Sequence, residues 1–152
     1  MTYKITSRSE QDTIELAENI ESEKFPNMVI CLEGDLGSGK TVFTKGFAAS
    51  LGVEEPITSP TFNIIKEYTS GEMDLYHMDV YRLDGKVADL GIEEYFQKDS
   101  IVIIEWADMI KDYLPPERLE IKIKISEDIE DTRIIVITPI GRDYEDLCEA
   151  VL

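Results

Sequence analysis

The sequence predicts an α/β domain built as a three-layer sandwich, with helices flanking a mixed central sheet. Two continuous apolar runs, 28–33 and 100–106, are typical of strands that are buried on both faces. Helical segments alternate with such strands, and hairpin-like segments are added to them, which favours a mixed sheet. Because 152 residues suit one hydrophobic core, we expect a single domain over residues 1–152.

The first two elements are predicted to be a short strand and an amphipathic helix. Residues 2–6, "TYKIT", read as the strand. Ser9 is placed to cap the helix, with Asp12 three residues further on. One face of this helix is apolar and consists of Leu16, Ala17 and Ile20.

The next unit is a strand, a glycine-rich loop and a second helix. The strand is the apolar run 28–33, "MVICLE". The helix is expected over 40–51, where Phe43 and Phe47 lie one turn apart. Gly52 is a natural stop, since glycine readily takes the left-handed conformation that ends helices.

The middle of the chain is predicted to form a hairpin, a helix and a strand. Segments 63–70 and 73–81 flank a short "GE" turn, which indicates a hairpin or near-hairpin. Residues 86–97 look helical, with an interruption at Gly91. The second buried strand, "SIVIIEW", follows at 100–106.

The last third of the chain adds a second hairpin and a closing helix. Residues 109–114 suit one or two helical turns that are ended by two prolines. The alternating segments 119–126 and 132–139 are joined by an acidic turn, so we expect an antiparallel pair at a sheet edge. Residues 143–152 form an amphipathic helix.

The composition excludes several classes of protein. Hydrophobic residues make up 43% and charged residues 31%, which is typical of a globular chain. No apolar run approaches the ~20 residues of a membrane span, and the first residues lack the apolar core of a signal peptide. We therefore expect a cytoplasmic protein with no membrane partner. Cys31 and Cys148 form no metal-binding pair and are interpreted as buried free thiols.

The net charge of −17 argues against direct binding of nucleic acid. The chain has 32 acidic residues against 15 basic ones, whereas affinity for DNA or RNA comes largely from Lys and Arg on phosphates. We expect no DNA partner. The acidity suits solubility or a basic protein partner instead.

Residues 34–41, "GDLGSGKT", match the phosphate-binding pattern G-x-x-x-x-G-K-[ST]. The match follows a predicted buried strand and opens a predicted helix, as a P-loop must, so the sandwich is expected to be of the P-loop NTPase type. Lys40 would supply a point charge to the outer phosphates, and the Thr41 hydroxyl would ligate Mg²⁺. The glycines that let backbone N–H groups turn toward phosphate are Gly34, Gly37 and Gly39.

Two acidic residues are candidates for the metal site that such a loop needs. Glu105 ends an apolar run, where a charge is costly without a partner. We favour a metal-binding or water-orienting role for it, with a salt bridge as the alternative. Asp79 alternates with His77 and Tyr81, so in a strand the three share one face. An ordinary polar edge strand is the alternative there.

The segment 58–62, "TSPTF", lies where P-loop proteins carry a switch loop. Thr61 is a candidate sensor of the terminal phosphate. A connecting turn stiffened by proline is an equally good interpretation.

Four motifs in order, "GDLGSGKT", "SPTF", "HMDVYR" and "IEW", resemble the TsaE (YjeE) family of small bacterial P-loop ATPases. "GFAASLG" and "LGIEEYF" add to the resemblance, which covers almost the whole chain from about residue 9 to the last hairpin. It implies a mixed sheet flanked by helices and the cofactors ATP and Mg²⁺. It also implies a complex with TsaD and TsaB that makes threonylcarbamoyladenosine in tRNA, where ATP hydrolysis supports turnover and tRNA is reached only through the complex.

The resemblance also assigns roles to individual residues. The essential catalytic residues would be Lys40, Asp79 and Glu105, and the metal ligands Thr41, Asp79 and Glu105. Residues 9–13 would lie beside the nucleotide base, and Arg133 is a candidate base contact. The expected nucleotide-binding residues are Gly37, Ser38, Gly39, Lys40, Thr41, Val42, Thr61 and Trp106.

Two other functions fit the loop less well. A small-molecule kinase usually closes a lid with several Arg residues over the transferred phosphate, but residues 106–120 supply a single Arg. A GTPase switch usually reads guanine with N-K-x-D, and no Asn here precedes a Lys. A slow ATP-dependent switch remains compatible with all of these motifs.

Overall fold

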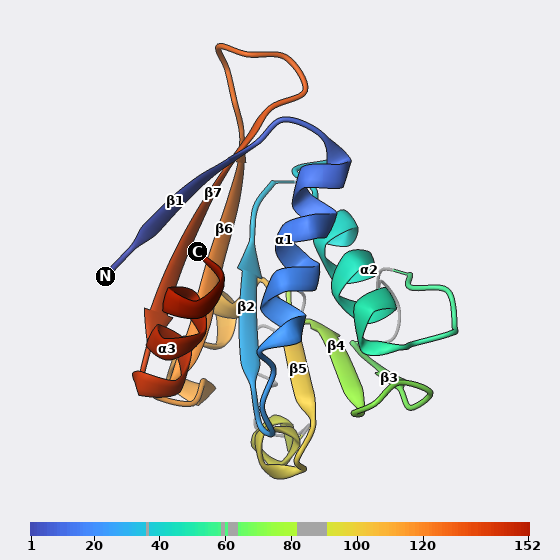
Figure 1. The fold of residues 1–152 in the computed structure, drawn as a ribbon. Coiled ribbons are helices and arrows are strands. Elements are labelled where there is room, and N and C mark those ends of the chain that lie inside the picture. The colour runs from blue at the N-terminus through green and yellow to red at the C-terminus, as the bar shows by residue number, and fades with distance from the viewer. Residues whose placement is uncertain (36, 59, 61–63, 82–90) are drawn as a thin grey trace.

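A computed structural model describes residues 1–35, 37–58, 60, 64–81 and 91–152. These residues form a seven-stranded sheet with the order β1-β7-β6-β2-β5-β4-β3 (Figure 1). The pairs β2–β5, β2–β6 and β4–β5 are parallel, and the other neighbours are antiparallel, so the sheet is mixed as predicted. The strands are β1 Tyr3–Ser7, β2 Val29–Glu33, β3 Ile65–Tyr68, β4 Leu75–Asp79, β5 Ile101–Glu105, β6 Arg118–Ile125 and β7 Arg133–Ile140.

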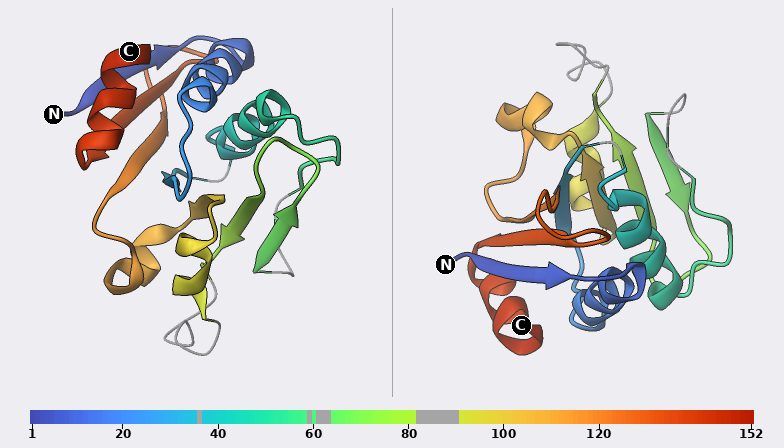
Figure 2. Two further views of the ribbon diagram at one scale, coloured as in Figure 1. Left: turned by 60° about the horizontal axis from the view of Figure 1, so that its bottom comes forward. Right: turned by 90° about the horizontal axis from the view of Figure 1, so that it is seen from above.

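The sheet lies between two layers of helices (Figures 1 and 2). Three α-helices, α1 (Glu10–Ser22), α2 (Lys40–Leu51) and α3 (Arg142–Val151), share a buried apolar cluster with one face of the sheet. The 3₁₀ segments η2 (Ile92–Gln97) and η3 (Ala107–Tyr113) pack on the other face. The predicted three-layer sandwich is confirmed.

Side chains on α2 show why the layer formed by α1, α2 and α3 is stable. Phe43 and Phe47 are fully buried, and their rings stack with centroids 6.4 Å apart. Gly46 brings α1 close, because a Cβ there would lie 3.1 Å from the Cα of Ile14. Gly52 ends the helix with φ +95°, as expected from the sequence.

The start of α1 also matches the prediction. Ser9 is extended, and its hydroxyl accepts the N–H of Asp12 at 3.2 Å. The Asp12 carboxylate accepts the N–H of Arg8 in return at 2.9 Å. The first bond satisfies one of the backbone donors that a helix start leaves open, and the second ties the residue before the cap to the first turn.

One prediction about the sheet is wrong. The pair β6–β7 is antiparallel, as expected, but it does not lie at a sheet edge. β1 pairs with the outer side of β7, and β6 lies parallel to β2 in the interior, so the edges are β1 and β3. An alternating pattern reveals which faces of a strand are covered, but it does not reveal the neighbours that its backbone bonds.

The remaining segments agree in outline with the sequence. β3 and β4 form the predicted antiparallel hairpin. Of the predicted helix 86–97, residues 86–90 lie outside the described part, and the rest is the 3₁₀ segment η2. Cys31 and Cys148 are both buried free thiols, as predicted. Among the described residues, no helix has the length and apolar character needed to cross a bilayer.

Tyr144 joins α3 to the centre of the sheet. Its hydroxyl accepts the N–H of Val29 at 2.8 Å, and its ring packs edge-on against Phe25 with centroids 5.0 Å apart. We predict that Tyr144→Phe lowers the free energy of unfolding by about 1–3 kcal/mol, because it leaves a buried N–H without an acceptor. Denaturant unfolding measures this.

The matched control is Tyr81→Phe. Tyr81 is 52% exposed, so removing its hydroxyl should change the free energy of unfolding by less than about 0.5 kcal/mol. Equal stabilities of wild type and Tyr144→Phe would contradict the prediction.

Candidate functional site

The glycine-rich loop 34–39 connects β2 to α2 at the carboxyl end of the parallel strands. Open α/β sheets bind their ligands at this end. β5 lies directly beside β2, with Leu32 opposite Glu105, and β4 lies beside β5, with Asp79 opposite Glu105. The sheet register therefore brings both predicted acidic residues to the same end as the loop.

Two features of the loop require glycine. A Cβ on Gly34 would collide with the Ser38 side chain and lie 2.6 Å from the carbonyl oxygen of Ile123 on β6. Gly37 and Gly39 have φ of +80° and +113°, which side chains disfavour. A Cβ on either of these two would meet no atom within 4 Å, so they border open space. The loop is thus fixed at its base and open at its tip.

Lys40, the first residue of α2, is nearly buried and points to the carboxyl ends of the strands. Its Nζ lies 3.6 Å from Glu105 Oε1 and 4.5 Å from the centroid of the Trp106 ring. A cation over an indole face is attracted by the ring electrons. Three of the predicted residues are therefore brought together, and the ion pair anticipated as an alternative role of Glu105 is present.

Glu105 is held from its other side by His77. The distance between His77 Nε2 and Glu105 Oε2 is 2.7 Å, and both side chains are buried. Burial alone would raise the pKa of Glu105, but the hydrogen bond and charge of His77, together with the charge of Lys40, outweigh it and lower the pKa. The Glu105 carboxylate therefore stays ionised at neutral pH.

Asp79 and Thr41 complete the predicted metal set, and both are more exposed than Lys40, Glu105 and His77. Asp79 is half-buried at the end of β4, where its Oδ1 accepts the N–H of Tyr81 at 3.1 Å. Thr41 is exposed on the first turn of α2. No group of three or more His, Cys, Asp or Glu side chains within the described part of the chain is arranged to hold a metal. A metal site that uses the Thr41 hydroxyl stays a prediction.

Trp106 has an unusual backbone and a paired ring. Its φ is +63°, in a region that residues other than glycine rarely occupy. Its ring packs on Tyr81 with centroids 4.8 Å apart. The strained turn places the indole against Lys40 at the end of β5, and such strain is often stored at functional sites.

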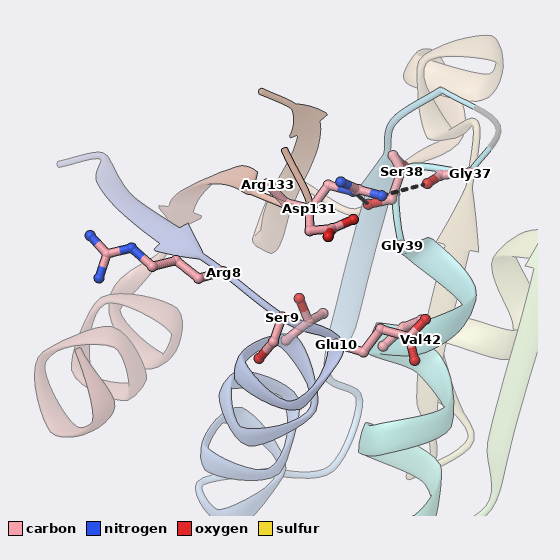
Figure 3. A pocket seen from close by; sticks show the side chains of 10 residues that line it. Arg8, Ser9, Glu10, Gly37, Ser38, Gly39, Val42, Asp131 and Arg133 are labelled. Atoms are coloured by element: carbon pink, nitrogen blue, oxygen red, sulfur yellow. Dashed lines mark hydrogen bonds between the residues drawn. The ribbon is translucent and has the colours of Figure 1, made fainter. Parts of the chain in front are cut away.

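A cavity of about 350 Å³ lies on the opposite side of the loop, between α1 and β7 (Figure 3). Its walls come from three segments that are distant in the sequence, and one of them is the segment 9–13, whose place beside a nucleotide base stays a prediction. The lining residues are Arg8, Ser9, Glu10, Thr13, Gly37, Ser38, Gly39, Val42, Asp131 and Arg133.

Comparison with known proteins identifies the family. The family model described as "Threonylcarbamoyl adenosine biosynthesis protein TsaE" matches residues 7–135. The chain belongs to the TsaE family. This confirms the resemblance drawn from the four sequence motifs.

Relatives within the TsaE family match over most of their length. The tRNA threonylcarbamoyladenosine biosynthesis protein TsaE of Bacillus subtilis is 53% identical over 124 residues, which cover 82% of this chain and 77% of that protein. The protein of the same name from Nostoc sp. is 36% identical over 95% of this chain and 90% of its own. The crystal structure of Bacillus subtilis YdiB superposes with a TM-score of 0.88 at 43% identity, covering 99% of this chain and 94% of that one.

Sequence reasoning missed part of the site in this TsaE-family chain. His77 is not among the site residues predicted from the sequence, although its alternation with Asp79 is a signal that points to it. Glu33 forms a hydrogen bond with Asp108. No sequence pattern indicates this contact, because the two residues are distant in the sequence. Thr61, predicted to sense a terminal phosphate, lies outside the described residues.

Glu33, the last residue of β2, has a perturbed carboxyl group. Burial, a hydrogen bond with Asp108 and the negative charge of Asp108 raise its pKa from 4.5 to about 7, although Lys122 at 3.9 Å lowers it. Because the pKa of Glu33 is raised in the folded state, the contribution of its protonated form to the free energy of unfolding is complete below pH 4.5. This contribution is lost as the pH rises through about 7.

We predict that Glu33→Gln becomes increasingly stabilising, relative to wild type, between pH 5 and pH 8. The amide cannot ionise, so the variant does not lose the contribution that wild type loses in this window. Urea unfolding at several pH values measures the difference. Glu18→Gln, at an exposed position on α1, is the control and should show a difference that does not change with pH. A pH-independent difference for Glu33→Gln would contradict the prediction.

Proposed function

We propose that this TsaE-family chain binds ATP with Mg²⁺, hydrolyses it, and thereby supports threonylcarbamoyladenosine modification of tRNA in a complex with TsaD and TsaB. The observation that carries the proposal is the convergence of Lys40 and Glu105 beside a glycine-rich loop that opens α2. Helix starts bind anions through their free N–H groups and positive dipole, and a lysine inside such a loop suits the outer phosphates.

The residues present fit a nucleotide. The tip of the loop is open at Gly37 and Gly39, which leaves room for phosphate oxygens near backbone N–H groups. The N-cap residue of α2 is Gly39, which has no side chain that could occupy the first N–H groups of the helix. The cavity between α1 and β7 adjoins the loop and has room for part of a nucleoside. Thr41, Asp79 and Glu105 would hold Mg²⁺, which when bound supplies positive charge beside the phosphate oxygens.

The chain's own residues then have distinct tasks. Phosphate oxygens would compete with Glu105 and Trp106 for the Lys40 ammonium, because they are negatively charged acceptors and the 3.6 Å between Lys40 Nζ and Glu105 Oε1 is longer than a normal hydrogen bond. Glu105 stays ionised through His77 and can accept a hydrogen bond from a water molecule. Asp79 lies on the neighbouring strand β4, at the same carboxyl end of the parallel strands. These positions support a hydrolytic site rather than a passive binding loop.

A kinase is less well supported. The Arg that could serve a lid, Arg118, instead donates to Glu120 at 2.9 Å and to the Pro115 carbonyl at 3.1 Å. Its guanidinium is thus engaged within its own segment.

We predict that Lys40→Ala weakens ATP binding by roughly 10–100-fold, the value of one charge-assisted hydrogen bond. Titration calorimetry measures the affinity, and circular dichroism checks the fold. Lys45→Ala, at an exposed position on the same helix, removes an equal charge and should leave the affinity within about twofold. Unchanged affinity in Lys40→Ala would contradict the role of Lys40.

Asp79→Asn and Glu105→Gln should slow hydrolysis at least tenfold while changing ATP affinity much less. Each swap keeps the size of the side chain but removes its charge, and tenfold corresponds to about 1.4 kcal/mol of transition-state stabilisation. Phosphate release by the assembled system measures the rate. Asp74→Asn, at an exposed position just before the opposite end of β4, is the control. Wild-type rates in both site variants would show that the acidic residues are misassigned.

The function as a whole is tested by dependence on partners. We expect weak hydrolysis by the chain alone, raised at least about tenfold by TsaD and TsaB, because a nucleotide-dependent switch shifts a population only if a partner binds its two states differently. Glu105→Gln should prolong the lifetime of the ATP-bound complex, whereas Lys40→Ala should not. Equal hydrolysis with and without the pair, together with lifetimes that do not depend on nucleotide, would refute the proposal. Tight binding of tRNA by the chain alone would contradict its indirect role.

A further inference from the structure

Arg133, at the start of β7, places its guanidinium against the backbone of the glycine-rich loop (Figure 3). Its Nε donates to the Ser38 carbonyl at 2.9 Å, and its Nη2 donates to the Gly37 carbonyl at 3.3 Å. Nη1 donates to the carbonyl of Thr132 at 3.4 Å. All three contacts are therefore to backbone carbonyls, and two of them hold consecutive residues of the loop.

The backbone of Arg133 is well anchored. It is paired with Ser7 of β1 on one side and with Ile125 of β6 on the other. The turn before it is closed by the N–H of Ser126, which donates to the Thr132 carbonyl at 2.9 Å. The guanidinium thus links the loop to the three paired strands β1, β7 and β6, so the position of these strands fixes the position of the loop.

The bonds from Arg133 to the Ser38 and Gly37 carbonyls determine the direction in which the N–H groups of the loop point. A trans peptide is planar, with its C=O and the following N–H pointing in opposite directions, and the chain has no cis peptide among the described residues. Holding the Ser38 carbonyl toward Arg133 therefore turns the N–H of Gly39 away from it. The Ser38 N–H is itself bonded to the Asp35 carbonyl at 3.0 Å, which fixes the preceding peptide.

A loop with three glycines needs such a restraint. Glycine has more backbone freedom than any other residue, so ordering it during binding costs free energy that would reduce affinity. A contact that orders the peptides before the ligand arrives removes part of this cost. The fork of a guanidinium can span two neighbouring carbonyls, which a lysine ammonium cannot do with the same geometry.

We propose that Arg133 is a positioning residue that holds the peptides of residues 37–39 so that the N–H of Gly39 faces the phosphate site, and that it does not read the nucleotide base. The inference rests on the proposed function for its ligand, the polyphosphate chain. It replaces the base contact expected for Arg133 from the sequence, since Nε and Nη2 are turned to the loop and Nη1 to the Thr132 carbonyl.

The first test needs no ligand. Amide hydrogen exchange is compared for wild type, Arg133→Gln, Arg133→Lys and Arg142→Gln. Arg142, on α3, is 91% exposed, so its variant removes the same charge away from the loop. Exchange in the segment 37–40 should become faster in both Arg133 variants and stay as in wild type in the control. Unchanged exchange in both Arg133 variants would overturn the proposal.

The second test compares ATP with inorganic triphosphate, each with Mg²⁺, by titration calorimetry. Loss of two hydrogen bonds that order the loop should weaken both ligands by about the same factor, roughly tenfold, in Arg133→Gln and in Arg133→Lys. If only ATP is weakened, Arg133 contacts the base. If Arg133→Lys binds both ligands as wild type does, its charge alone matters. Either result would overturn the proposal.

The two tests also separate this inference from the proposed function. If wild type binds neither ATP nor triphosphate, the proposed function fails, while hydrogen exchange still decides whether Arg133 orders the loop. If wild type binds both and the Arg133 variants bind equally well, only the positioning role fails. Circular dichroism confirms folding, and Arg133→Lys carries the test if Arg133→Gln does not fold.

Discussion

A buried network made of the ion pair Lys40–Glu105 and the imidazole of His77 is the interaction on which the rest of the site depends. Charges removed from water are costly unless each has a partner, and removing one partner leaves the other unpaired. Glu105 has a partner for each oxygen, with Oε1 near Lys40 and Oε2 near His77. Because these groups come from α2, β5 and β4, the network also fixes how the helix that carries the loop sits on the sheet.

The sheet order explains how one loop can serve two regions. β2 is central, with β5 and β4 on one side and β6, β7 and β1 on the other. The first side supplies the acidic residues and Trp106, whose chemistry suits phosphates and a metal. The second side supplies Arg133, which bonds to the loop backbone, and part of the wall of the cavity that adjoins the loop. The loop is therefore held between a charged, buried network and an anchored arginine.

The overall charge of −17 is compatible with an anion site because the relevant field is local. Lys40 and the start of α2 are positive at short range, and screening by salt reduces the effect of distant surface carboxylates. Glu105 is the ion-pair partner of Lys40, so it lowers the cost of keeping that ammonium buried. The acidic surface in turn disfavours competing polyanions such as nucleic acid.

The sequence by itself determined the fold class and the place of the glycine-rich loop between a strand and a helix, and it predicted the two acidic residues as site candidates. These follow from local rules: continuous apolar runs are buried strands, and a glycine-rich loop between strand and helix binds phosphate. Position in the chain cannot show which distant segments become neighbours. Only the tertiary structure revealed that β1 pairs with β7 and that Glu33 contacts Asp108. For the same reason, the position of Arg133 against Gly37 and Ser38 was decided by strand pairing. Such contacts depend on the register of strands that lie far apart in the sequence, and no local pattern of residues encodes that register.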